Sequence, residues 1–151
     1  MEFQRESLFE WVTSVLREPD PPAELKRLGG RARRALEENL APDESARVVI
    51  RGTAGQAIVG TDLRVLVLPA FMPGDDPVAE VSSWTYLDVL CVEVNERFHG
   101  GSVVLRVPDG DVAIAAAGDW DVIRARVATL RGFVAGAHSD SLPAELRLVA
   151  L

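Results

Sequence analysis

Few side chains in this sequence are of the types that carry out chemistry: one cysteine, Cys91, and two histidines, His99 and His138. Nucleophilic catalysis needs a nucleophile with a base beside it, and neither histidine stands next to a serine or cysteine motif. A single cysteine cannot form an internal disulfide, and one thiol with two scattered histidines has no metal-site spacing. We therefore expect Cys91 to pack as a small apolar residue, both histidines to lie at the surface, and the chain not to be an enzyme.

Two groups of aspartates could instead hold a cation through oxygen ligands. Asp75 and Asp76 are adjacent, and Asp109 and Asp111 flank a glycine. Neither group has the regular ligand spacing of a calcium loop, and aspartate is common in turns because its carboxylate bonds nearby main-chain amides. The sequence therefore predicts turn residues at these positions, and neither a metal nor another cofactor.

Five basic residues gather between positions 26 and 34, in a segment whose apolar residues recur at helical spacing. Arg27, Arg31 and Arg34 share one face of that predicted helix, opposite the leucines. They are the candidates for contact with an anion or a membrane, although the face could also meet nucleic acid or an acidic partner. The alternative, which the sequence favours, is a solvated face in which Arg34 pairs with Glu38 four residues on.

The segment 69–77 places two large apolar side chains, Phe71 and Met72, among prolines and before the carboxylates of Asp75 and Asp76. If Phe71 and Met72 fold back onto the core, they only pack. If they project, they form an apolar anchor with an acidic rim, which is typical of a protein contact. These four residues are therefore candidates for binding a protein, and both alternatives stay open.

The composition is that of a soluble globular protein, because 48% of the 151 residues are hydrophobic and 26% are charged. A formal net charge of −7 opposes bulk attraction to nucleic acid and to anionic lipid. The first residues mix charges where a secretory signal would be apolar, and no apolar run approaches the roughly 20 residues of a spanning helix. We expect a cytoplasmic protein with no nucleic acid as partner, and lipid contact is less favoured than protein contact.

Apolar spacing predicts a helical hairpin over residues 1–40, in front of the main domain. The first helix covers 3–17, and the second runs from about 22 to 40, with Gly29 and Gly30 in its interior. Each interior glycine costs about 1 kcal/mol relative to alanine. The second helix is therefore expected either to bend at this pair or to be held by packing on something else.

From residue 43 the helical period gives way to short apolar runs separated by turn residues, which is typical of antiparallel hairpins. Seven strands are predicted, at 47–52, 56–61, 64–68, 79–84, 89–95, 102–107 and 111–116. A final helix begins at the cap residue Asp119, and its apolar seam consists of Trp120, Ile123, Val127, Leu130, Val134 and Ala137. The main domain therefore spans 43–137, with the helix completing a core between two packed sheets.

Both ends of the chain carry more apolar surface than short free appendages usually tolerate. Trp11 lies in the first predicted helix, and Leu148 and Val149 lie in the apolar tail at 138–151. Burying such side chains is worth roughly 1.5 to 3 kcal/mol each. We expect at least one of these ends to contact another chain, and the alternative is that the two ends cover each other within a monomer.

Three local motifs resemble those of the pleckstrin-homology (PH) superfold, in its bacterial and GRAM-type branches. A Thr-Asp-Leu-Arg turn at 61–64 joins two apolar runs, Tyr86 and Asp88 precede another, and Trp120 stands early in the closing helix. The resemblance covers about residues 43–137. It implies an α+β fold, with a seven-stranded antiparallel PH-like barrel or sandwich closed by a C-terminal helix. Residues 1–40 lie outside the resemblance.

Many PH domains bind inositol phosphates through basic residues of the first hairpin, and this resemblance can be tested residue by residue. Here the hairpin offers only Arg47 and Arg51, and the one lysine of the chain, Lys26, lies outside it. A phosphate site normally needs several convergent donors, so the lipid function does not transfer. We expect a noncatalytic protein-binding or assembly module, with a protein partner or self-association. The alternative is a peripheral membrane adaptor that uses the basic face of the second helix.

Overall fold

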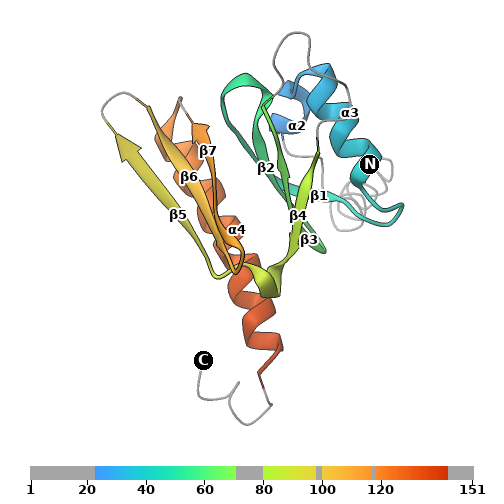
Figure 1. Cartoon of the computed structure of the whole chain (residues 1–151), viewed down its shortest axis with the longest axis vertical. Coiled ribbons are helices and arrows are strands. Elements are labelled where there is room, and N and C mark those ends of the chain that lie inside the picture. The colour runs from blue at the N-terminus through green and yellow to red at the C-terminus, as the bar shows by residue number, and fades with distance from the viewer. Residues whose placement is uncertain (1–22, 71–79, 98–99, 117, 143–151) are drawn as a thin grey trace, which may run out of the picture.

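A computed structural model describes residues 23–70, 80–97, 100–116 and 118–142 (Figure 1). Its strands are β1 (Ala46–Arg51), β2 (Ala57–Thr61), β3 (Arg64–Leu68), β4 (Ser82–Thr85), β5 (Cys91–Arg97), β6 (Gly100–Val107) and β7 (Gly110–Ala116). Its helices are α2 (Ala23–Arg27), α3 (Gly30–Asn39) and α4 (Trp120–Asp140). All seven predicted strands and the closing helix are present, and their bounds differ from the predicted ones by one to three residues at most ends.

The strands form two antiparallel sheets that meet at α4. One sheet has the order β1-β2-β3-β4 and the other the order β5-β6-β7. A single 3-10 turn, η2 (Tyr86–Asp88), connects β4 to β5 and turns the chain from one sheet into the other. Among the described strands no ladder joins the two sheets, so the fold is a two-sheet sandwich and not the closed barrel that the sequence analysis also allowed.

Helix α4 packs against both sheets, and Figure 1 shows it running behind the three-stranded sheet and out beyond one end. Its seam was predicted correctly, because Ile123, Val127, Leu130 and Val134 are all buried. Close approach of α4 requires a glycine in β2. A Cβ atom on Gly60 would stand only 2.8 Å from a methyl group of Leu130.

The four-stranded sheet is apolar on both faces. Its inner face contributes Ile58 to the core shared with the second sheet and α4, and its outer face contributes Val59 to a second core beneath α2 and α3. All five residues of β2 are buried as a result. The second predicted helix therefore lies on the sheet of its own chain, with Leu28 and Leu36 among its buried side chains.

The second predicted helix is not continuous. Helix α2 ends at Arg27, the backbone is non-helical at Leu28 and Gly29, and α3 begins at Gly30. The guanidinium of Arg33 donates to the main-chain oxygen of Leu25 at 3.0 Å and ties the two short helices together. The break at the glycine pair is the bend that the sequence analysis allowed for, and it has a consequence for the basic residues on either side of it.

Candidate functional site

The Thr-Asp-Leu-Arg turn at 61–64 forms a polar network that holds the structure together at one end of the four-stranded sheet. The hydroxyl of Thr61 accepts the main-chain N–H groups of Leu63 and Arg64, both at 3.0 Å. Glu44 lies just before β1. Its two carboxylate oxygens accept hydrogen bonds from Nε and Nη2 of Arg64, each at 3.0 Å. The same Glu44 accepts the Thr61 hydroxyl at 2.6 Å, so the turn motif has a structural role.

This network changes the protonation behaviour of Glu44, whose side chain is fully buried. Burial alone would raise the pKa of that carboxyl group. Hydrogen bonds from Arg64, Thr61 and the main chain of Ala41, together with the charge of Arg64, outweigh burial and lower the pKa to about 2. Glu44 therefore stays ionised at neutral pH and serves as the anionic partner of Arg64, which leaves it unsuited to accept a proton in catalysis.

Tyr86 links the turn motif to η2 and to the closing helix. Its hydroxyl donates to the main-chain oxygen of Thr61, and its ring packs against Phe133 with centroids 5.8 Å apart. Burial, with smaller contributions from the charges of Asp62 and Glu44, raises the pKa of this phenol. The aromatic-and-aspartate motif that resembles PH domains therefore also builds the fold.

Seven of the predicted protein-contact residues lie outside the described residues, so their roles stay predictions. They are Trp11, Phe71, Met72, Asp75, Asp76, Leu148 and Val149. His99 lies outside the described residues as well. Asp109 occupies the turn between β6 and β7 as predicted, whereas Asp111 lies in β7 and pairs with Arg106 at 3.0 Å.

His138 and Cys91 both lie along the boundary between α4 and β5. His138 is half-buried and not simply a surface residue, because its Nε2 atom lies 3.0 Å from the main-chain oxygen of Val89. Cys91 is also half-buried, and its thiol sulfur lies 3.8 Å from a carboxylate oxygen of Glu93. Within the described residues no three histidine, cysteine or acidic side chains gather in a way that would hold a metal ion.

The three candidate arginines do not share one helix face, because the break after α2 separates Arg27 from Arg31 and Arg34. Arg34 and Glu38 are both exposed on α3, and the ion pairs of the described residues do not include the predicted pair between them. The single basic face was therefore wrong. The role of these arginines in contacting an anion or membrane stays a prediction.

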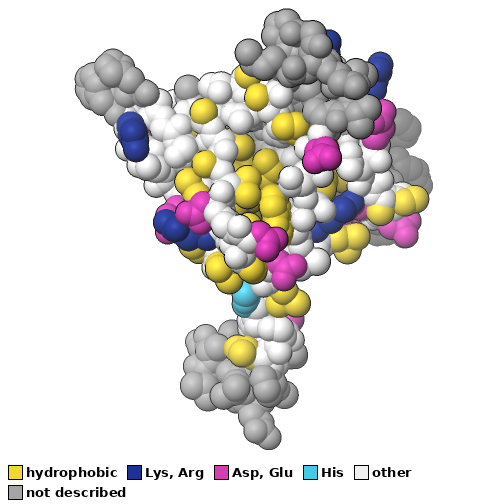
Figure 2. All heavy atoms as spheres, in the orientation of Figure 1, with side chains coloured by type: hydrophobic (Ala, Val, Ile, Leu, Met, Phe, Trp, Pro, Cys, Tyr) yellow, Lys and Arg dark blue, Asp and Glu magenta, His cyan; other side chains and the backbone are white. Residues whose placement is uncertain are grey.

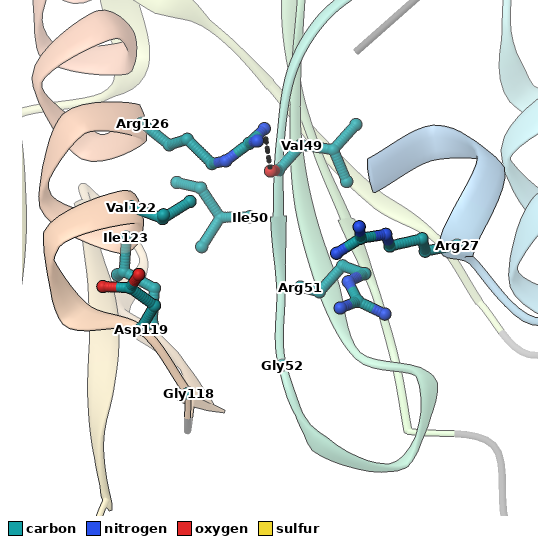
Figure 3. Close-up of a pocket in the computed structure, with 10 residues that line it drawn as sticks. All are labelled: Arg27, Val49, Ile50, Arg51, Gly52, Gly118, Asp119, Val122, Ile123 and Arg126. Atoms are coloured by element: carbon teal, nitrogen blue, oxygen red, sulfur yellow. Dashed lines mark hydrogen bonds between the residues drawn. The ribbon is translucent and has the colours of Figure 1, made fainter. Parts of the chain in front are cut away.

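Arg27 instead lines a cavity of about 380 Å³ between α2, β1 and the beginning of α4, together with Arg51 and Arg126 (Figure 3). In Figure 3, Arg27 and Arg51 are drawn on the same side of the β1 ribbon, and Arg126 reaches toward β1 from α4. Nη1 of Arg126 donates to the main-chain oxygen of Val49 at 3.2 Å. We call this the arginine cavity, and sequence reasoning missed it because its three cations come from three separate elements.

A second candidate surface lies at the end where α4 leaves the two sheets. Of the four large hydrophobic side chains that are exposed among the described residues, Leu63, Leu87 and Leu90 lie at this end, with 57%, 50% and 61% of their surface exposed. Leu63 lies in the turn between β2 and β3. Leu87 lies in η2, which follows β4, and β4 pairs with β3. Figure 2 shows hydrophobic and acidic side chains together in this region.

Two cavities flank α4 at the same end. One, of about 580 Å³, lies on the β1 side and is lined by Tyr86, Phe133 and the helix glycines Gly132 and Gly136, among others. The other, of about 320 Å³, lies on the β5 side, where Leu90 forms part of its wall. We call the three exposed leucines and these two cavities the α4 end.

No helix among the described residues is both long enough and apolar enough to cross a membrane. No protein-family model matches the chain, and no curated protein matches it.

Two solved structures are similar to the chain. One is a DUF1696 family protein with a pleckstrin-homology domain from Shewanella loihica PV-4, with 17% identity and a TM-score of 0.45 over 65% of this chain and 91% of that one. The other is a pleckstrin homology domain from Shewanella amazonensis SB2B, with 16% identity and a TM-score of 0.47 over 68% of this chain and 96% of that one. At these scores the assignment rests on the sheets of four and three strands and the closing helix described above. This topology is the one that the PH resemblance of the sequence implies.

Proposed function

We propose that the chain is a noncatalytic binding module that docks a protein partner on the α4 end. The observation that carries this proposal is the concentration of exposed leucines beside two cavities at one end of the fold. Large exposed apolar side chains that cluster beside concave surfaces are typical of protein interaction sites. Exposed Leu90 on the rim of a cavity supplies an apolar contact next to a space that a partner side chain can enter.

The charges at this end favour a partner with basic residues around its apolar anchor. Asp62 and Asp88 are exposed next to Leu63 and Leu87, and Asp62 also lines the larger cavity. A second copy of the chain would bring another net charge of −7 to the contact, which opposes self-association. A different protein is therefore the favoured occupant, and self-association is the alternative outcome of the test.

The membrane alternative has less support than a protein partner. It relied on a continuous basic face formed by Arg27, Arg31 and Arg34, and those residues divide between α2 and α3. The exposed leucines of the α4 end are accompanied by aspartates, which anionic lipid would repel.

The test compares two matched variants of the full chain, each purified from its own cells under native conditions. Leu90→Asp places a charge in the α4 end, whereas Val122→Asp places one at the other end of α4, where Val122 is 40% exposed. We expect the unaltered chain and Val122→Asp to copurify with the same protein in fixed stoichiometry. Leu90→Asp should lose that protein while its circular dichroism and melting temperature stay unchanged.

Native mass by multi-angle light scattering separates the outcomes. A dimer of the chain that Leu90→Asp dissociates would make a second copy the occupant. A full-length chain that is monomeric and retains no stoichiometric protein would contradict the proposal, as would a partner that both variants retain equally.

A further inference from the structure

We propose that the arginine cavity binds a small soluble molecule that carries a phosphate group. This site lies at the opposite end of α4 from the leucines, so the inference goes beyond the proposed docking function and does not depend on it. The cavity volume of about 380 Å³ falls within the range of small-molecule sites. Its lining is rich in charged groups, which selects for a charged ligand.

The charges that line the cavity are predominantly positive although the whole chain is acidic. Arg27, Arg51 and Arg126 contribute three guanidinium groups, and Asp119 contributes one carboxylate. An oxygen of Asp119 already accepts the main-chain N–H of Asp121 at 3.0 Å as the cap of α4. The cavity therefore holds a local positive charge in a chain whose net charge is −7. Such a site attracts a small anion while the rest of the surface repels extended polyanions.

Two of these arginines lack the partners that other arginines of the fold have. Arg64 pairs with Glu44 at 3.0 Å, and Arg106 pairs with Glu93 and Asp111 at 2.9 and 3.0 Å. Arg27 and Arg51 have no hydrogen-bond or ion-pair partner among the described residues, and both line this cavity (Figure 3). An oxyanion that enters the cavity would therefore meet two guanidinium groups that no carboxylate of the described residues already neutralises.

Phosphate matches this arrangement better than a single carboxylate does. Guanidinium groups bind phosphate oxygens in bidentate fashion, and a phosphate has enough oxygens to accept from both Arg27 and Arg51. The main chain adds to the site. Gly52 N–H donates to Gln56 across the β1–β2 ladder, so the N–H and C=O groups of Val49 and Arg51 both point away from β2. The N–H groups are donors that an anion at this edge would use, and the carbonyl oxygen of Val49 already accepts from Arg126.

The PH resemblance points to the first hairpin, which contributes Arg51, but it implies neither Arg27 nor Arg126. Arg27 lies before residue 43, outside the part of the chain that resembles PH domains, and it reaches the cavity only because α2 packs beside β1. Arg27 is the one lining residue of the cavity, among the described residues, that lies before residue 43. Binding should therefore depend on a residue that the sandwich alone does not contain.

The test measures binding of inorganic pyrophosphate to the full chain by isothermal titration calorimetry, with sulfate at equal ionic strength as the comparison anion. We expect saturable binding of one pyrophosphate per chain, tighter than any binding of sulfate. Arg27→Gln and Arg51→Gln should each weaken it at least about tenfold, because each loses a charged hydrogen bond. Arg34→Gln is the matched control, since Arg34 is an exposed arginine of α3 that does not line the cavity, and it should bind as the unaltered chain does.

Several results would overturn the inference. Failure of pyrophosphate binding to saturate, binding no tighter than that of sulfate, or equal binding by Arg51→Gln would each exclude a built phosphate site. An equal loss in Arg34→Gln would place the binding on the helix surface instead of in the cavity. A second experiment measures binding to phosphatidylcholine vesicles that contain phosphatidic acid. Vesicle binding that Arg51→Gln abolishes, without any binding of pyrophosphate, would replace the soluble ligand with a lipid headgroup.

Discussion

Nε of Arg131 lies 2.7 Å from the main-chain oxygen of Val92, so the closing helix donates a hydrogen bond to β5, an edge strand of the three-stranded sheet. Arg126 makes the corresponding bond to Val49 of β1, an edge strand of the four-stranded sheet. One helix therefore binds the backbone of both sheets through arginines that lie five positions apart. Edges covered in this way are protected from pairing with other chains.

Replacing Arg131 with methionine should lower the free energy of unfolding by about 1 to 2 kcal/mol, because a carbonyl in a partly buried position loses a charged donor. Arg124→Met is the control. Arg124 pairs with Glu96 and Asp121 on an exposed part of the surface, where ion pairs contribute little, so its loss should be smaller. Urea denaturation of both variants measures the difference. Equal losses would mean that the bond to Val92 adds nothing beyond surface charge.

Gly101→Ala should destabilise the fold, because the new methyl group has no room between β5 and α4. A Cβ atom there would stand 2.7 Å from the ring of Trp120, and it would collide with the main-chain oxygen of Asn95. Gly132→Ala makes the same chemical change in α4 with no atom within 4 Å, and it should gain up to about 1 kcal/mol from helix propensity. Thermal unfolding should therefore shift in opposite directions for the two variants. A Gly101→Ala variant as stable as the unaltered chain would show that Trp120 does not need this close contact.

Lowering the pH should remove part of the stability through Glu44. Its folded pKa of about 2 lies below the ordinary value of 4.5 for a glutamate, so the unfolded chain binds the proton more readily. The contribution is fully present above about pH 4.5 and disappears as the pH falls toward about 2, and it amounts to roughly 3 kcal/mol. Denaturation curves across this range should show the loss in the unaltered chain and a flatter profile in Glu44→Gln.

Thr61→Val serves as the control for that titration. It removes the 2.6 Å bond to Glu44 but leaves both bonds from Arg64, so most of the pH dependence should remain. An unchanged pH profile in Glu44→Gln would show that other carboxyl groups cause the acid sensitivity.

The C-terminal tail gives the last prediction. Helix α4 continues to Asp140, beyond the predicted end at residue 137, so a deletion of 143–151 spares the helix, whereas a cut at 139 would shorten it. If the tail makes an intermolecular contact, this deletion should lower the native mass or release a bound partner without changing the melting temperature. A deletion of 1–18 tests the other end in the same way. Variants that lose stability and nothing else would indicate that the ends cover each other.

The periodic parts of the fold could be predicted from the sequence, because the burial of one face of an element sets the spacing of its apolar residues. The α4 seam was correct at Ile123, Val127, Leu130 and Val134, since a helix on a sheet must bury one stripe. The strand of lowest accuracy was β4, which was predicted at 79–84 and lies at Ser82–Thr85. It begins with two exposed serines, Ser82 and Ser83, so the apolar residues upstream misplaced its predicted beginning.

The candidate sites were much harder to predict than the elements. Glu44 follows another acidic residue and precedes a serine, and nothing in that local pattern distinguishes a buried carboxylate from a turn residue. Arg27, Arg51 and Arg126 meet only through the tertiary packing of α2, β1 and α4. Spacing along the chain contains no such information, so the sequence pointed to a helix face where the fold forms a cavity.

Burial of β2 on both sides has a consequence for how the chain finds its correct strand alignment. Because Ile58 and Val59 enter two different apolar cores, a slip of β2 by one residue would exchange their faces and still bury both. Burial of apolar side chains therefore does not by itself reject such a slip of β2. Gly60 rejects it from within the strand, because a slipped side chain would meet Leu130. Polar contacts reject it at the end of the sheet, where Thr61 and Arg64 must both reach Glu44. An ionised carboxylate outside the strands thus adds alignment information that the apolar side chains of β2 lack.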